Sequence, residues 1–314
     1  MTEGLDFTAE DIELMLANLD AFSPEEALEI DRMVDELNTR TANASAYDDL
    51  IEFCKLMQPD YIVGKHHRIL ADMLMAIERG EKDRICVNIP PRHGKSQLVS
   101  IFYPAWFLGR NPDKKVMMVS HTTDLAVDFG RKVRNLIALD DYRSIFPTVK
   151  LAQDSKSAGR WNTNVGGEYY ACGIGSALAG RGADLLLIDD PHSEQDVING
   201  NFEIFDKAYE WFTFGARTRL MPGGRVAIIQ TRWHLDDLTG RVTRDMAQND
   251  RSDQYDIIEF PAIIEVKNKK TKKIVEKPLW PEFFDLEALL RTKASMPTFQ
   301  WNSQYQQQPT AEEA

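Results

Sequence analysis

Residues 85–96, with the sequence ICVNIPPRHGKS, carry the clearest structural signal in the chain. An apolar run typical of a β-strand leads into a tight turn, and Gly94, Lys95 and Ser96 open a helix. Phosphate groups require this combination of backbone N–H donors at a helix N-terminus, a lysine, and a hydroxyl for Mg²⁺. The usual pattern has another glycine five residues before Gly94, where this chain has Ile89. The segment alone therefore leaves nucleotide binding and a plain surface turn equally open.

Two adjacent acids follow another apolar run, at residues 185–190, LLLIDD. Asp189 and Asp190 would fall at the carboxyl edge of a parallel sheet, beside the place of a phosphate loop. We expect Asp189 to hold Mg²⁺ through water and Asp190 to align or deprotonate an attacking water. Glu194 is the alternative for the second role, and capping of the turn at Pro191 is the alternative for both acids. Together the two motifs favour nucleotide hydrolysis.

A third apolar run ends in polar residues at 228–238, IIQTRWHLDDL. Polar groups on the same sheet edge can sense a γ-phosphate. His234, Asp236 and Asp237 have side chains that bind metals, but they lie within one turn and lack a distant partner. A helix cap is therefore favoured over a metal site.

The order of elements indicates an α/β fold. Segments with helical periodicity separate apolar runs typical of buried parallel strands, which predicts a mainly parallel sheet covered on both faces. The predicted strands are Arg84–Ile89, Lys115–Ser120, Glu168–Ile174, Leu185–Asp189, Arg225–Thr231 and Tyr255–Phe260.

The two ends of the chain differ from this central part. Ser23 followed by Pro24 predicts a helix start in an acidic N-terminal helical region, residues 1–54. The pattern changes beyond Pro261, which ends the core, residues 55–261. Residues 262–314 predict a small subdomain: a hairpin around a lysine-rich turn, a helix near residues 285–293, and a polar tail, QYQQQPTAEEA, typical of a linker.

Composition restricts the class of protein. The 314 residues are 43% hydrophobic, without an apolar run that could span a membrane, and the acidic N-terminus is unlike a secretory signal. Three widely spaced cysteines make a disulfide framework or a C-x-x-C site unfavourable, which fits a reducing compartment.

Charge is unevenly distributed. The net charge is -12, and residues 1–60 hold sixteen acids and three bases, which leaves the remainder near neutral. Basic stretches at residues 131–134 and 269–273 are compatible with a DNA footprint, and equally with solvated surface.

The motifs together resemble the large terminase subunit of tailed bacteriophages. PPRHGKS, GRGAD, LLLIDDP and IIQTRWHLDDLTGRV occur in that family's order, and the likeness extends over residues 55–310, including the QYQQQP tail. The resemblance implies a P-loop NTPase domain of the additional-strand class with a small lid subdomain. It also implies a following RNase H-like nuclease domain, before which this chain stops, so nuclease activity is not expected here.

The resemblance also implies site residues. Lys95 and Ser96 would bind the phosphates and Mg²⁺ of ATP with Asp189, and Arg181 would reach the nucleotide of a neighbouring subunit. Asp190 replaces the usual glutamate and is one methylene shorter. The predicted nucleotide-binding residues are Pro91, Arg92, His93, Gly94, Lys95, Ser96, Gln97 and, at the adenine, His67; the predicted catalytic residues are Asp190, Arg181, Arg92 and Glu194; the coupling residues are Thr231 and Arg232.

The function implied is ATP hydrolysis that drives double-stranded DNA into a procapsid. The partners implied are DNA, the portal protein, the small terminase subunit and further copies of the chain in a ring, with a monomer expected in isolation. The place of action would be the host cytoplasm, at the portal of the procapsid and not in the mature virion. Two alternatives are a helicase-like translocase, which needs a second RecA-like domain, and a non-hydrolysing assembly module.

Overall fold

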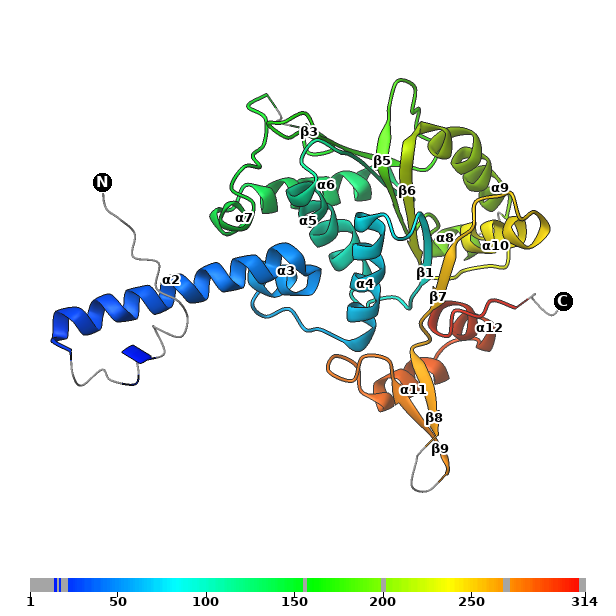
Figure 1. The fold of residues 1–314 in the computed structure, drawn as a ribbon. Helices are drawn as coiled ribbons and strands as arrows, with labels where there is room; N and C mark the ends of the chain where they lie inside the picture. The colour runs from blue at the N-terminus through cyan, green and yellow to red at the C-terminus, as the bar shows by residue number, and fades with distance from the viewer. Residues whose placement is uncertain are drawn as a thin grey trace.

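A seven-stranded sheet forms the centre of the protein (Figure 1), with the strand order β3-β4-β2-β5-β6-β1-β7. The computed structural model describes residues 14–15, 17, 22–154, 157–198, 202–267 and 272–310. Neighbouring strands are parallel except β3, which is antiparallel to β4. The strands are β1 (Arg84–Asn88), β2 (Lys115–Ser120), β3 (Arg160–Asn162), β4 (Glu168–Gly173), β5 (Ala183–Asp189), β6 (Leu220–Gln230) and β7 (Asp256–Glu259).

The predicted P-loop α/β fold is confirmed, since each of the six predicted strands is present. β6 lies between β1, which leads into the Gly-Lys-Ser turn, and β5, which ends in the acids. That is the extra strand expected of the additional-strand class. β3 was not predicted, because it has three residues and is held by pairing with β4 and by stacking of Trp161 on Tyr169 at 4.8 Å.

Side chains of successive residues enter different cores, because a strand alternates its two faces. In β5, Leu185 and Leu187 join one core, and Leu186 and Ile188 join the other. The central strands therefore bury both faces, which explains their continuous apolar sequence.

Helices cover both faces of the sheet (Figure 1). The first face packs against α3 (Leu50–Met57), α4 (Lys65–Arg79), η2 (Gln97–Phe102), α5 (Tyr103–Arg110), α6 (Thr123–Ile137) and α7 (Asp140–Ile145). The second face packs against η3 (Trp211–Ala216) and α10 (Leu238–Gln248). Between β5 and β6 the chain also forms α8 (Glu194–Ile198), α9 (Glu203–Glu210) and η4 (Arg217–Arg219).

The N-terminal part is helical where the structure describes it, as predicted. α2 (Pro24–Asp48) begins at Ser23, whose side chain accepts the backbone N–H of Glu26 while Glu26 accepts the N–H of Ser23. Figure 1 shows α2 extending away from the sheet. The boundary predicted between residues 54 and 55 falls inside α3, whose Phe53 and Cys54 belong to the main core.

The lid segment, as we name residues 262–310, has a small apolar cluster of its own. It contains the predicted hairpin, β8 (Ile263–Lys267) with β9 (Ile274–Pro278), and the predicted helix, α11 (Leu286–Ala294), followed by α12 (Thr298–Gln300) and η5 (Trp301–Tyr305). Residues 268–271 of the lysine-rich turn lie outside the described residues. Within the described ranges, every helix is too short or too polar to cross a bilayer.

The polar tail corrects one prediction. Residues 304–307 are not a free linker, because the Tyr305 carbonyl accepts the N–H of Ala262 at 2.6 Å and the side chains of Gln306 and Gln307 are bonded to other segments. Composition indicated a linker since glutamines are usually solvated, but these amides find backbone partners.

Gly130 of α6 lies where the helix packs closely against Ala158 and Tyr169. A Cβ there would lie 2.5 Å from the Ala158 carbonyl oxygen and 2.9 Å from Tyr169. Gly130→Ala should destabilise the fold by about 1–3 kcal/mol, although alanine is the better helix former by about 1 kcal/mol. The control is Gly215→Ala, whose Cβ would meet nothing closer than 3.6 Å. Urea denaturation measures both, and a stabilised Gly130→Ala would contradict the packing.

Candidate nucleotide-binding site

The carboxyl ends of three adjacent strands form the site. Asn88 at the end of β1 is paired with Gln230 of β6, and Ile229 of β6 is paired with Asp189 of β5. The loops after these strands carry the three predicted motifs, so the fold brings them together.

The phosphate loop, residues 89–96, contains two left-handed residues, Arg92 with φ 59° and Gly94 with φ 79°. A Cβ on Gly94 would lie 2.3 Å from Nε2 of His67, so glycine is required both by φ and by space. The helix that follows adopts π geometry over Gln97–Phe102, a form that recurs at functional sites. Pro91 and His93 complete the turn, with Nδ1 of His93 on the Pro91 carbonyl at 2.8 Å.

Lys95 and the two acids form a charged cluster in which Lys95 and Asp189 are buried and Asp190 is partly exposed. Lys95 Nζ lies 2.7 Å from Oδ2 of Asp190, and Oδ1 of Asp190 accepts the backbone N–H of Thr231 at 2.9 Å. Asp189 Oδ2 accepts the hydroxyl of Ser100 at 2.6 Å. The Ser96 side chain also favours the charged form of Asp189. Asp190 has a left-handed φ of 45°, which its fixed contacts must hold against backbone strain.

The cluster alters the protonation equilibria of its members. Burial, together with the charge of Asp190, raises the pKa of Asp189 in spite of Lys95 and the two serines. Burial opposes the charge on Lys95, but the carboxylates of Asp190 and Asp189 outweigh it, so the pKa of the Lys95 ammonium is raised. The lysine therefore stays charged and ready to bind phosphate.

Oxygen atoms at the site fit Mg²⁺. Oδ1 of Asp189 is buried and has no hydrogen-bond partner among the described residues, and the Ser96 hydroxyl is adjacent. Across those residues, no three His, Cys, Asp or Glu side chains converge to hold a metal by themselves. A cation held by one carboxylate, one hydroxyl and phosphate oxygens is the form that Mg²⁺ prefers.

Three histidines, His66, His67 and His93, form what we name the histidine cluster. Nε2 of His66 and Nε2 of His67 both lie on the His93 carbonyl, at 3.0 and 2.9 Å. Nδ1 of His67 accepts the N–H of Gly64, so its Nε2 is the donor. This corrects the prediction that His67 contacts adenine. The His67 ring is fully buried, both of its nitrogens have hydrogen-bond partners, and one of these partners is the His93 carbonyl of the phosphate loop.

The lid segment contacts the phosphate loop through the same cluster. The ring of Phe284 stacks on His93 at 4.9 Å, and Trp280 packs edge-on against His67 at 4.7 Å. Trp280 is 6% exposed and His93 is fully buried. Movement of the lid would therefore disturb the loop directly.

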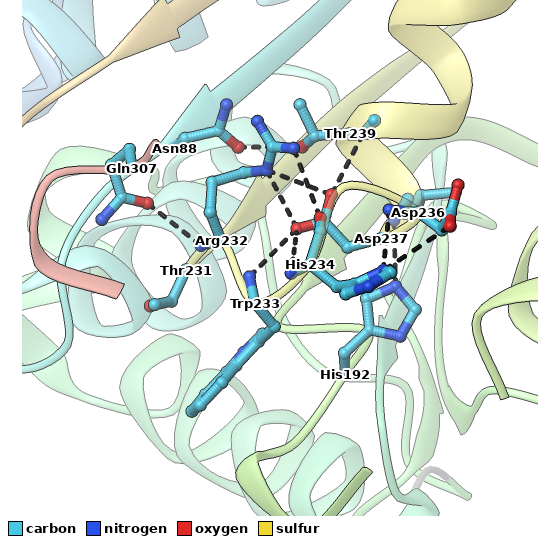
Figure 2. A network of polar contacts seen from close by, with 12 residues as sticks. Asn88, His192, Thr231, Arg232, Trp233, His234, Asp236, Asp237, Thr239 and Gln307 are labelled. Atoms are coloured by element: carbon cyan, nitrogen blue, oxygen red, sulfur yellow. Dashed lines mark hydrogen bonds and ion pairs between the residues drawn. The ribbon is translucent and has the colours of Figure 1, made fainter. Parts of the chain in front are cut away.

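The coupling residues Thr231 and Arg232 follow β6, and Figure 2 shows Arg232 beside Asp237. The Thr231 hydroxyl donates to the Ile89 carbonyl at 3.1 Å, which joins the coupling turn to the phosphate loop. The Arg232 side chain does not contact the loop in this way: its Nε donates to the two carboxylate oxygens of Asp237, at 2.9 and 3.1 Å. Asp237 is fully buried and also accepts the N–H of Gly240 at the start of α10, so the predicted helix cap is confirmed.

Four other predicted residues lie outside this cluster. Arg92 and Glu194 are exposed, and Glu194 shares with Asp190 the wall of a cavity of about 730 Å³. The side-chain amide of Gln97 donates to Oε1 of Gln58 at 2.6 Å. Arg181 lies at the opposite, amino edge of the sheet, 3.2 Å from Glu168 and with its guanidinium 4.6 Å from the ring centre of Tyr170.

Sequence reasoning missed several supporting residues. Ser100 contacts Asp189, and His66 contacts the His93 carbonyl. Ser100 lies one helical turn after Ser96, which is a signal that helix periodicity could have provided. The contacts of Trp280 with the histidine cluster join segments more than 180 positions apart, and no local pattern reveals them.

The histidine cluster predicts acid sensitivity. Burial lowers the pKa of His66, of His67 to about 3 and of His93 to about 4, below the value of about 6.5 in the unfolded chain. The unfolded state binds more protons below pH 6.5, so stability is complete above that pH and falls as the pH drops toward 4. Each histidine contributes a slope of about 1.4 kcal/mol per pH unit.

His67→Gln should reduce this slope by about one histidine's share, since the amide can still donate to the His93 carbonyl but does not titrate. Urea unfolding between pH 7 and pH 4.5 measures the free energy of unfolding of both proteins. Identical slopes would contradict a buried neutral His67.

Comparison with known proteins gives a family match over part of the chain and a similar fold. Residues 86–199 match the family described as terminase large subunit, T4likevirus-type, N-terminal. The large terminase of bacteriophage HK97 is similar in structure with a TM-score of 0.50 and 12% identity, over 79% of this chain and 51% of that one. The large terminase ATPase domain of Thermus phage P74-26 gives a TM-score of 0.47 at 15% identity, over 76% and 92% of the two chains.

No curated protein sequence matches the chain significantly. The chain spans about half the length of the HK97 terminase, 51%. The resemblance predicted from the motifs is nevertheless confirmed: residues 86–199 match the N-terminal region of the terminase large subunit family, and the chain has a large-terminase fold.

Proposed function

We propose that this chain is the ATPase domain of a viral DNA-packaging motor, which couples ATP hydrolysis to translocation of double-stranded DNA into a procapsid. The observation that carries the proposal is the convergence of Lys95, Ser96, Asp189 and Asp190 at one sheet edge. The family match over residues 86–199 supports the same conclusion.

Lys95 and Asp190 supply the central step of the mechanism. Backbone N–H groups of the loop and the Lys95 ammonium bind the outer phosphates of ATP. Lys95 then exchanges its contact with Asp190 for one with phosphate, which frees Oδ2 of Asp190. That oxygen accepts a proton from, or orients, the water that attacks the γ-phosphorus, and ADP leaves as the bridging oxygen takes the electron pair.

Ser96 and Asp189 would hold a magnesium ion, which would neutralise phosphate charge. Asp189 is suited to this role because its Oδ1 is buried and unpartnered among the described residues. The Ser100 hydroxyl fixes the other oxygen at 2.6 Å, so the carboxylate keeps one orientation. Asp190 already reaches Lys95 at 2.7 Å, so its shorter side chain is long enough to contact the loop.

Arg181 acts on a neighbouring subunit. Its contact with Glu168 at the amino edge of the sheet keeps it away from the acids of its own chain at the carboxyl edge. A guanidinium supplied by the next copy in a ring would neutralise transition-state charge only after assembly. Arg92 at the loop and Arg232 in the coupling turn remain candidates for phosphate contact and for relay to DNA.

The partners follow from the same proposal. The ring docks on the portal protein of a procapsid in the host cytoplasm, receives DNA from the small terminase subunit, and leaves before the virion matures. The motor must accept every sequence, so it binds the phosphate backbone of the duplex and not the bases.

Turnover should depend on Lys95 and Asp190. Asp190→Asn should lower kcat by about 10²–10⁴-fold with nucleotide affinity retained, because the amide cannot accept the proton. Lys95→Ala should abolish binding and turnover, and Glu194→Gln, a matched change of an exposed acid, should be nearly silent. Steady-state ATP hydrolysis with a fluorescent-nucleotide titration measures both quantities. Normal turnover in Asp190→Asn with loss in Glu194→Gln would move the role to Glu194.

Arg181→Ala should bind ATP but lose hydrolysis by about 10³-fold, and it should inhibit wild type in mixed rings. The matched control is Arg160→Ala, since Arg160 contacts the same Glu168 at 3.1 Å. Normal hydrolysis by Arg181→Ala at every protein concentration would exclude the role in a neighbouring site.

The deciding experiment is Mg²⁺-dependent ATP hydrolysis against protein concentration, with and without double-stranded DNA. We expect turnover that rises faster than linearly with concentration and is absent in Lys95→Ala. Neither binding nor hydrolysis at any concentration would favour an assembly module. A portal-dependent packaging assay then separates packaging from other translocation.

A further inference from the structure

Three consecutive glutamines near the end of the described chain have three different surroundings. The Gln306 side chain bonds both backbone groups of Ile263, accepting its N–H at 3.2 Å and donating to its carbonyl at 3.1 Å. The Gln307 side chain turns into the protein, and Gln308 is exposed. The tail is thus fixed to the lid by one residue and to the nucleotide site by the next.

Gln307 is held in a specific conformation. It is 1% exposed and has a left-handed φ of 59°. Its Oε1 accepts the backbone N–H of Arg232 at 3.0 Å, and its Nε2 donates to the Gln304 carbonyl. Both ends of the buried amide are satisfied, so the contacts compensate for the backbone strain.

Gln307 and Asp190 accept hydrogen bonds from two consecutive backbone N–H groups. The N–H of Thr231 donates to Oδ1 of Asp190 at 2.9 Å, and the next N–H along the chain, that of Arg232, donates to Gln307. Figure 2 shows Gln307 pointing to this turn on the side away from Asp237. One peptide unit therefore separates a contact to the hydrolytic acid from a contact to the tail.

We propose that Gln307 is a positioning residue for Asp190. It fixes the Thr231–Arg232 turn, and the turn in turn holds the Asp190 carboxylate in the orientation that accepts the water. The inference rests on the proposed ATPase function and adds the tail to the residues on which turnover depends. Without the Gln307 oxygen, the buried Arg232 N–H loses its acceptor and the turn must rotate to find another.

The same connection operates in the other direction. When Lys95 leaves Asp190 for phosphate, the carboxylate keeps the Thr231 N–H as its remaining contact. A shift of Asp190 therefore moves the turn and, through Gln307, the tail. We therefore expect residues 304–308 to respond when nucleotide binds.

The three glutamines provide matched variants. Gln307→Leu has a similar volume but no acceptor, and it should lower kcat by about tenfold with the Kd for ATP within about twofold of wild type. Gln307→Glu keeps the acceptor but loses the amide donor to the Gln304 carbonyl, so its kcat should lie between those of Gln307→Leu and wild type. Gln306→Leu, which releases the tail from the lid, and Gln308→Leu, at an exposed position, should both leave kcat within about twofold of wild type.

Wild-type kcat in Gln307→Leu, or an equal loss in Gln306→Leu, would overturn the positioning role and leave the ATPase proposal intact. Absence of turnover in wild type would refute the ATPase proposal itself. If circular dichroism shows that Gln307→Leu is unfolded, amide hydrogen exchange on the wild-type protein tests the connection between the turn and the tail. Mg²⁺ with ATPγS should change exchange in residues 229–233 and in 304–308, and an unchanged tail would refute the inference.

Discussion

The ion pair between Lys95 and Asp190 is the interaction around which the site is organised. Asp189, which is 1% exposed, ends the central strand β5, and the partly exposed Asp190 follows it directly. Without compensation, such a pair would be unfavourable. Lys95 supplies the positive charge, and hydroxyl and backbone N–H donors supply the remaining contacts. The loops of three strands must converge for this to occur, and parallel pairing of β1, β6 and β5 makes them converge.

Two further contacts hold that arrangement from outside. The histidine cluster supports the phosphate loop, and Trp280 and Phe284 of the lid cover it. The Thr231 hydroxyl joins the coupling turn to the Ile89 carbonyl, at the position where the usual motif has glycine. The phosphate loop of this chain contains one glycine fewer than the usual pattern, and contacts from neighbouring side chains stabilise its conformation.

Local patterns were sufficient to predict six of the seven strands of the main sheet and the charged cluster. An apolar run that ends in two acids has one favourable place in a parallel sheet, so Asp189 and Asp190 were located correctly next to Lys95. The roles of His67 and Gln307 could not be predicted, because both depend on backbone groups brought close by tertiary folding. The short strand β3 depends in the same way on a ring stacked on its neighbour strand.

The left-handed backbone at Asp190 restricts which side chains can occupy that position. Aspartate and asparagine adopt a positive φ more readily than longer or branched residues, because their short polar side chains bond locally. The shorter acid is therefore the one that this turn accommodates, and glutamate would gain reach while straining the main chain. A change between the two acids, chemically the mildest available, is consequently not conservative here. The backbone of the turn and the acid it carries must change together during evolution.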